Sequence, residues 1–217
     1  VLGYGFFFQK IYLEKQSEIN IGMVGFLGLF LLSIISTTTH LFISHNFYHN
    51  LFLLFLGLFL FFYLRDKTSI KIFLYCIILL ILGYFMSKTN EDFSYYHLPN
   101  SLQFSENKLQ FGLGNLNHGF KHYSSLFQLN SIFYFPKIKF YLFNLTDFLF
   151  LIFAICFLYQ KIFSMKAVKY NFITTFYIFS IILILTKFSR IAEYGTDIPG
   201  QILILIIILI STDLLFT

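Results

Sequence analysis

The chain has 217 residues, of which 58% are hydrophobic, 22% aromatic and only 12% charged. Ordinary soluble domains carry about a quarter charged residues, so this composition excludes a soluble domain and predicts an all-α, polytopic membrane protein. The formal net charge of +5 does not indicate nucleic-acid binding, because the basic residues are unclustered and lie at the ends of apolar runs, where membrane topology places them.

The apolar runs approach the length of about 20 residues that a helix needs to cross a bilayer. Residues 1–8 are typical of a truncated span, and six complete spans are predicted at 21–39, 47–64, 70–86, 140–159, 170–186 and 201–217. Since the chain starts at Val1 inside an apolar run, we expect a fragment of a longer protein, with residues 1–217 forming one transmembrane domain.

Glycines recur every three residues in the first complete span, at Gly22, Gly25 and Gly28. This spacing favours a smooth strip for close helix packing, and ordinary membrane-helix glycine is the alternative. Cys76 and Cys156 each lie inside an apolar run and are expected to be small buried side chains rather than a disulfide or metal framework.

The links between spans predict an orientation. The links near residues 10–15, 65–71 and 161–169 carry two, three and three basic residues, whereas 40–46 and 187–200 carry none and two. The positive-inside rule places the first set in the cytoplasm of a bacterial inner membrane. Strict alternation then places the long segment 87–139 and the link 187–200 together on the outer, periplasmic side.

Segment 87–139 is the longest interruption of the apolar runs and holds three of the six histidines and three of the ten acidic residues. We expect surface helices within this outer loop. One would contain Pro99 in its first turn and end at Gly112 and Gly114. A second would carry a set of aromatic residues on one face: Phe120, Tyr123, Phe127 and Tyr134.

Two acids, Glu91 and Asp92, follow a span directly, where a carboxylate can act as a general base or hold a divalent cation. The alternative is a pair of solvated acids that stop the helix. Tyr95, Tyr96 and His97 come within the next two turns, so a helical conformation would place Asp92 on one face with Tyr95 or Tyr96. Tyrosines of a membrane-interface belt are the alternative.

The link 187–200 offers Lys187, Arg190 and Asp197. The planar guanidinium of Arg190 suits phosphate oxygens, although pairing with Glu193 would serve equally. His118 and His122, four residues apart, have the spacing of some metal ligands. Headgroup-level histidine is the favoured interpretation for this pair, and also for the earlier histidines at positions 40, 45 and 49.

The order of these motifs resembles a known family. Glu91-Asp92 with Tyr95-Tyr96-His97-Leu98-Pro99, then Gly112-Leu113-Gly114-Asn115-Leu116 and Tyr123-Ser124-Ser125, is similar to a group of uncharacterised bacterial multi-pass membrane proteins. More broadly, the pattern resembles the GT-C type membrane glycosyltransferases, chiefly through the acidic loop. In that family the acidic loop usually follows the first span, whereas here at least three predicted spans precede it.

The resemblance implies an enzyme that transfers a sugar from a polyprenyl-phosphate donor to a glycan or lipid acceptor, in envelope polysaccharide or glycolipid assembly. Asp92, or Glu91 in second place, would be the base or the metal-binding acid. Lys187 or Arg190 would neutralise the lipid phosphate. The other candidate substrate-binding residues are Tyr95, Tyr96, His97, Asn115, His118 and Asp197. The identity of any cofactor stays open, with a divalent cation as the candidate.

Two other functions remain alternatives. An O-antigen polymerase or ligase also has many spans and a large outer loop, but such proteins use loop arginines, and segment 87–139 has none. A transporter or flippase-like protein is expected to place ionisable residues at mid-span. Within the predicted spans the exceptions to an uncharged interior are Asp147 and Asp213.

Overall fold

The computed structural model describes residues 1–12, 20–65, 67–85, 91–164, 172–187 and 195–216, and every regular element in these residues is a helix. The predicted all-α class is therefore confirmed for the described part of the chain. A short first helix, α1 (Leu2–Tyr12), precedes the longer ones.

Each of the six predicted spans forms a helix. These are α2 (Ile21–His40), α3 (Phe47–Leu64), α4 (Lys67–Phe85), α8 (Leu145–Ser164), α9 (Phe172–Lys187) and α10 (Asp197–Phe216). Four helical segments among the described residues are long and apolar enough to cross a membrane: α2, α3, Phe140–Ser164 and Asp197–Leu215. The helix α9 is apolar but has only 16 residues, so the number of crossings stays a prediction.

Asparagine caps explain where two of these helices begin. The side chain of Asn20 accepts a hydrogen bond from the amide of Met23, and that of Asn46 accepts one from the amide of His49, both at 3.1 Å. Each cap satisfies an amide that the first helical turn leaves without a partner. The apolar run that follows then forms backbone bonds within the helix, as a hydrocarbon environment requires.

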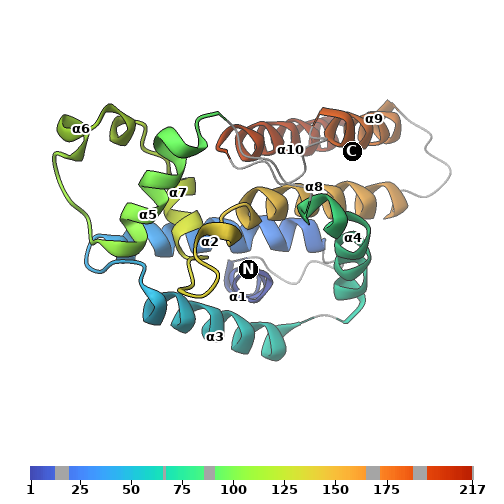
Figure 1. Cartoon of the computed structure of the whole chain (residues 1–217). Helices are drawn as coiled ribbons and strands as arrows, with labels where there is room; N and C mark the ends of the chain where they lie inside the picture. Colours follow the sequence, from blue (N-terminus) through green and yellow to red (C-terminus); the bar gives the residue numbers. More distant parts are fainter. Residues whose placement is uncertain (13–19, 66, 86–90, 165–171, 188–194, 217) are drawn as a thin grey trace.

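The helices α2 and α8 form the centre of the bundle (Figure 1). Helices α1 and α3 lie on one side of this pair and α9 and α10 on the other, while α4 packs against α8. In the membrane-length segments, 72% of the residues of the α8 window are buried, against 17% in α3. The helix α8 is thus the core of the bundle, and α3 is a peripheral helix.

The glycine strip of α2 packs as predicted. A Cβ atom added at Gly22 or Gly25 would collide with Phe153 of α8, and one added at Gly28 would collide with the carbonyl oxygen of Val1. The strip therefore divides between two partners, α8 and the beginning of the chain. Cys76 and Cys156 are both buried, which confirms their interpretation as small core side chains.

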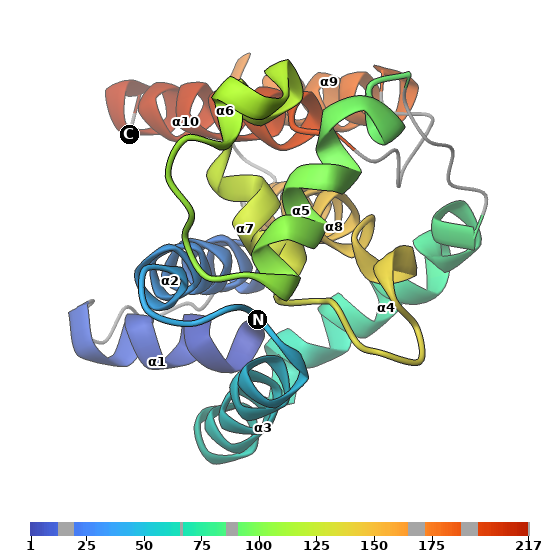
Figure 2. The ribbon, with the colours of Figure 1, turned by 60° about the vertical axis from the view of Figure 1, so that its left-hand side comes forward.

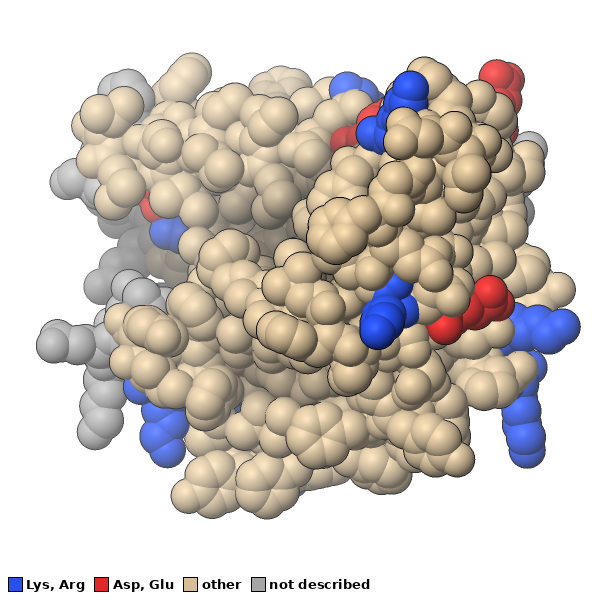
Figure 3. All heavy atoms as spheres, turned by 90° about the vertical axis from the view of Figure 1, so that its left-hand side faces the viewer, with Lys and Arg blue, Asp and Glu red and all other residues tan. Residues whose placement is uncertain are grey.

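Residues 91–144, which we call the cap, lie at one end of the bundle and come forward in Figure 2. The cap contains short helices only: η1 (Phe93–His97), α5 (Leu98–Glu106), α6 (Leu113–Leu116), η2 (His118–Lys121), α7 (Ser125–Ser131) and η3 (Phe140–Leu142). Figure 3 looks onto this end and shows a few charged side chains among many neutral ones.

The predicted helices of this loop are corrected in two respects. Pro99 lies in the first turn of α5 as expected, but α5 ends at Glu106, well before Gly112. The second predicted helix is wrong: Phe120 lies in η2 and Phe127 in α7, with a break between them. The break arises because two side chains start new helices. The Asn117 side chain accepts a hydrogen bond from the Gly119 amide, and the Ser124 hydroxyl accepts one from the Leu126 amide. Nor is α7 a surface helix, since its residues 127–131 are all buried.

The start of the last helix also differs from the prediction. The helix α10 begins at Asp197 rather than at residue 201, so that Pro199 lies in its first turn. Proline is tolerated there because the first-turn amides have no partner within the helix. Asp197, expected in a link, is thus part of α10 itself.

Candidate functional site in the cap

A buried polar network, centred on His45 in the link between α2 and α3, joins the cap to the bundle. The ring Nδ1 of His45 lies 2.5 Å from the Ser131 hydroxyl of α7, and its Nε2 lies 2.9 Å from the Ser36 carbonyl oxygen of α2. The backbone amide of His45 donates to the carbonyl of Phe104 in α5 at 2.9 Å. One histidine thus contacts three segments that are far apart in sequence.

Asn50 and His40 extend this network. The Asn50 amide group donates to the carbonyl oxygens of His45, Ser131 and Tyr134 at 2.8, 3.0 and 3.0 Å. The Nε2 of His40 lies 3.1 Å from the Asn107 carbonyl oxygen in the cap. Burial, reinforced by the neighbouring His49 and His40, lowers the pKa of His45 from 6.5 to about 3. The ring is therefore neutral and structural.

The interpretation of these histidines as headgroup-level residues is wrong. His40 and His45 are almost completely buried, and His49 is half-buried, because the cap covers them. A signal was present in the sequence: three histidines and Asn50 surround a short link that carries no lysine or arginine. Such a cluster has to find partners within the protein when it is buried.

The acidic motif forms a tight helical turn. Backbone amides of Tyr95, Tyr96 and His97 all donate to the carbonyl oxygen of Asp92, at 3.2, 3.1 and 3.3 Å. This winding brings the Tyr96 hydroxyl to the Asp92 carboxylate, to which it donates a hydrogen bond at 3.1 Å. The predicted shared face of Asp92 and Tyr96 is confirmed, whereas Tyr95 is 56% exposed and lies outside this contact.

Two aromatic rings, one from η1 itself and one from the segment that follows η2, pack around Tyr96. Its ring centroid lies 4.4 Å from that of His97, which is buried, and 4.8 Å from that of His122, which is exposed. The Asn100 amide group fixes the arrangement, because it donates to the Tyr96 carbonyl at 2.7 Å and to the Gly119 carbonyl at 3.1 Å. Helix η1 is thereby held against η2.

A charge of the second predicted outer segment acts on the same tyrosine. The pKa of Tyr96 is raised, first by desolvation, then by its hydrogen bond to Asp92 and by the negative charges of Asp92 and Asp197. Asp197 begins α10, so residues more than 100 positions apart act on one hydroxyl. The raised pKa keeps the Tyr96 phenol protonated, as a donor to the carboxylate. Asp92, Tyr96, His97, His122 and Asp197 form what we call the Tyr96 site.

Asp147 holds the second segment in position. It lies in the first turn of α8, is almost completely buried, and accepts a hydrogen bond from the Gly195 amide at 3.0 Å. The first turn of a helix stabilises a carboxylate through its unpaired amides. Asp147 therefore supports the chain two residues before Asp197 instead of marking a path through the bilayer.

Other predicted site residues are not brought to Tyr96. Glu91, Asn115 and His118 are exposed, and the His118 ring lies beside His122 at a centroid distance of 5.3 Å. Lys187 is the last residue of α9. Arg190 and Glu193 lie outside the described residues. Among the residues that the structure does describe, no three His, Cys, Asp or Glu side chains are arranged to hold a metal ion.

The second acid within a predicted span, Asp213, lies near the end of α10 and pairs with Lys161 of α8 at 2.5 Å. The Tyr177 hydroxyl of α9 lies beside the Asp213 carboxylate. The pair joins α8 to α10 at the ends away from the cap, and Tyr177 adds a contact from α9. Its charges are thus matched within the bundle.

Together, the apolar helix bundle and the polar cap define a membrane-type helical protein with a candidate site at one end. The model of a family described as a domain of unknown function, DUF8201, matches residues 1–215, and the chain belongs to this family. Neither a curated protein nor a solved structure matches the chain.

Proposed function

We propose that the protein is a multi-pass enzyme of the bacterial inner membrane, similar to GT-C glycosyltransferases, which transfers a sugar from a polyprenyl-phosphate donor in envelope polysaccharide or glycolipid assembly. In this proposal the cap faces the periplasm and α2, α3, α4, α8, α9 and α10 cross the bilayer. The acceptor is a hydroxyl of a glycan or a lipid.

The observation that carries this proposal is the hydrogen bond, at 3.1 Å, that Tyr96 donates to the exposed carboxylate of Asp92. The proposed transfer needs two segments of the outer side to act on one substrate, and the negative charge of Asp197 in the second segment also raises the pKa of Tyr96. Asp92 is exposed, so its carboxylate is accessible to a substrate hydroxyl.

The chemistry follows from these positions. The oxygen of the acceptor hydroxyl attacks the anomeric carbon of the donor sugar, and Asp92 accepts the proton of that hydroxyl. The bond from this carbon to the phosphate oxygen breaks, and the polyprenyl phosphate leaves with its negative charge. Lys187, or Arg190 in the undescribed link, would neutralise that charge. Tyr96 orients the Asp92 carboxylate, and the rings of His97 and His122 form the wall of the acceptor site.

The partners of the two other acids make a transporter a weaker candidate. Intramembrane charges of transporters mark substrate and ion pathways. Here Asp213 is paired with Lys161, and Asp147 accepts the Gly195 amide. An O-antigen polymerase or ligase stays an alternative to the proposed transferase.

The proposal is tested by complementation of a deletion strain, with variants compared at matched membrane levels. Asp92→Asn is expected to lower glycan synthesis by about 100-fold or more, the scale of a lost general base. The matched control is Glu106→Gln, which removes an exposed acid elsewhere in the cap and is expected to leave synthesis unchanged.

Glu91→Gln discriminates between the two adjacent acids. Because Glu91 is exposed and Asp92 is the acid bonded to Tyr96, we expect near-normal synthesis in this variant. Normal glycan from Asp92→Asn, in protein that inserts as the wild type does, would contradict the proposed transferase.

A further inference from the structure

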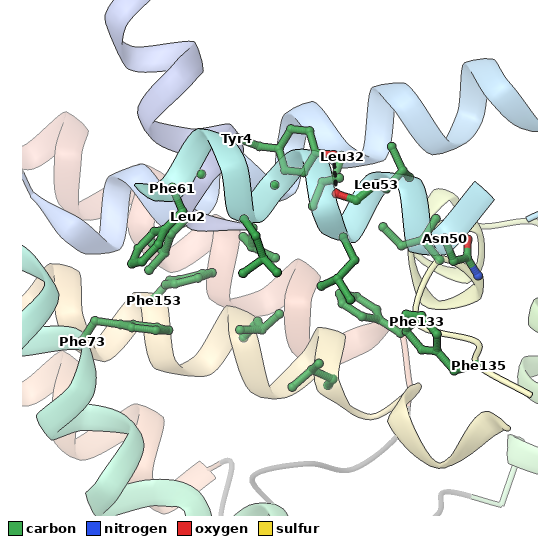
Figure 4. Close-up of a pocket in the computed structure, with 18 residues that line it drawn as sticks. Leu2, Tyr4, Leu32, Asn50, Leu53, Phe61, Phe73, Phe133, Phe135 and Phe153 are labelled. Carbon is green, nitrogen blue, oxygen red and sulfur yellow. Dashed lines mark hydrogen bonds between the residues drawn. The ribbon is translucent and has the colours of Figure 1, made fainter. Parts of the chain in front are cut away.

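A cavity of about 360 Å³ lies inside the bundle, between α1, α3 and α8 (Figure 4). Its volume is within the range of small-molecule sites in proteins, which is about 300–1,000 Å³. The cavity lies on the α3 side of the central α2–α8 pair, whereas α10, which begins with Asp197, lies on the opposite side (Figures 1 and 2). It is therefore separate from the Tyr96 site.

The wall of the cavity offers hydrocarbon contacts. Leucine, phenylalanine and glycine predominate in its lining, with Asn50 at one end. The hydroxyl of Tyr4, which also lines the cavity, donates to the carbonyl of Leu53 at 2.8 Å. The Asn50 amide group donates to three backbone carbonyls. Both polar side chains are committed to the protein, so the lining selects an apolar ligand.

The length of the cavity matches one leaflet of a membrane. Its lining on α3 runs from Asn50, beside the cap, to Phe61, which corresponds to about 16 Å at 1.5 Å per residue. Half of a bilayer's hydrocarbon core is about 15 Å. Since the cavity begins at the cap end of α3, it extends over the depth that a lipid chain of that leaflet occupies.

The cavity also has an opening where lipid is expected. Leu54 and Leu58 line it and yet are 47% and 42% exposed, so the cavity reaches the outer surface beside α3. Other large apolar side chains of the same helix, including Phe55 and Phe59, are exposed as well. In a membrane this surface faces hydrocarbon chains, which makes a lipid the available ligand.

We propose that this cavity binds one hydrocarbon chain of a phospholipid from the leaflet on the cap side. The proposal requires insertion into a membrane and does not depend on the transferase reaction. At its cap end the cavity is closed by Ile132, Phe133 and Phe135, which directly follow α7. A bound chain therefore supports the segment through which the cap meets the bundle.

The absence of tryptophan from the sequence provides a direct test. A single tryptophan introduced as Phe133→Trp reports on the cavity, because bromine atoms on a phospholipid chain quench indole fluorescence on contact. Phe55→Trp, at an exposed position of α3, is the reference for lipid contact. Phe150→Trp, at a buried position of α8 outside the cavity, is the reference for protection.

The variants are reconstituted into vesicles of phosphatidylcholine brominated on one chain. We expect Phe133→Trp to lose as large a fraction of its fluorescence as Phe55→Trp. Adding Leu149→Phe, which fills the cavity from α8, is expected to abolish the quenching of Phe133→Trp and to leave that of Phe55→Trp unchanged. Adding Leu149→Met, which conserves the volume, is expected to retain both.

Two results would overturn the proposal. Quenching of Phe133→Trp no stronger than that of Phe150→Trp would mean that no lipid chain enters. Quenching that persists after Leu149→Phe, while Leu149→Met behaves identically, would mean that the bromines reach position 133 from outside the cavity. If Leu149→Phe does not fold, the comparison of Phe133→Trp with Phe150→Trp still decides the first point.

Discussion

Two clusters of similar residues lie at the cap end of the bundle and differ in exposure. The His45 network has its polar groups buried and directed at backbone carbonyls and hydroxyls of neighbouring helices. The Tyr96 site has an exposed acid, an exposed histidine and, in η1, a protonated tyrosine. Histidine and asparagine therefore do not by themselves indicate a binding site. The His45 network holds the cap against the bundle, whereas the Tyr96 site is open to a ligand.

The largest effect on stability is expected from Asn50→Leu. This change removes the side-chain donor of the His45, Ser131 and Tyr134 carbonyls, of which the Ser131 carbonyl still accepts a hydrogen bond from the Tyr134 amide. A buried group left unsatisfied costs about 1–3 kcal/mol, so we expect the free energy of unfolding in detergent micelles to fall by about 3 kcal/mol. The matched control is Asn115→Leu, at an exposed amide of α6, which is expected to change stability little. Equal effects of the two would show that the network does not hold the cap.

The second prediction concerns the stability of the protein at acidic pH. The pKa of His45 is lowered from 6.5 to about 3 in the folded protein, so folding favours the neutral ring. The contribution of His45 to the free energy of unfolding is fully present above pH 6.5. It is lost as the pH falls toward 3, because His45 binds a proton at a higher pH in the unfolded chain than in the folded protein. Linkage gives a loss of about 2 kcal/mol at pH 5. Thermal unfolding from pH 7.5 to 5 measures it.

His45→Gln is the control for this titration, since it removes the ionisable ring. His122→Gln, in the Tyr96 site, should retain the acid dependence of the wild type because His122 is exposed. An acid dependence that survives His45→Gln unchanged would assign it to another group. The two variants thus test whether the buried His45, and not the exposed His122, makes the stability depend on pH.

The sequence predicts the features of this fold that depend on local spacing. Apolar runs locate the six long helices, the glycine period locates a packing face of α2, and the four-residue separation of Asp92 and Tyr96 predicts their contact. Contacts between distant segments have no such signal. Ser131 lies 86 positions from His45, and the charge of Asp197 reaches Tyr96 across about 100 positions. Only the packing of the cap onto the bundle creates these pairs.

The failed prediction of a second loop helix has a different cause, because its signal was in the sequence. An aromatic period over residues 120–134 indicated one amphipathic helix. Asn117 and Ser124, however, are residues that favour N-caps, and each begins a separate short helix. Local hydrogen bonding of polar side chains thus overrides an apolar period in a segment with few continuous apolar residues.

The smallest effect among these predictions is expected from Tyr96→Phe, which tests the second cluster without removing its acid. Loss of the hydrogen bond that orients Asp92 is expected to raise the activation free energy by about 1 kcal/mol, which lowers the rate roughly fivefold. Tyr95→Phe, at an exposed neighbouring tyrosine, is expected to leave the rate unchanged. If both tyrosine variants behave alike, the hydroxyl of Tyr96 does not position Asp92. Asp92 would then have to act without the segment that leads into α10.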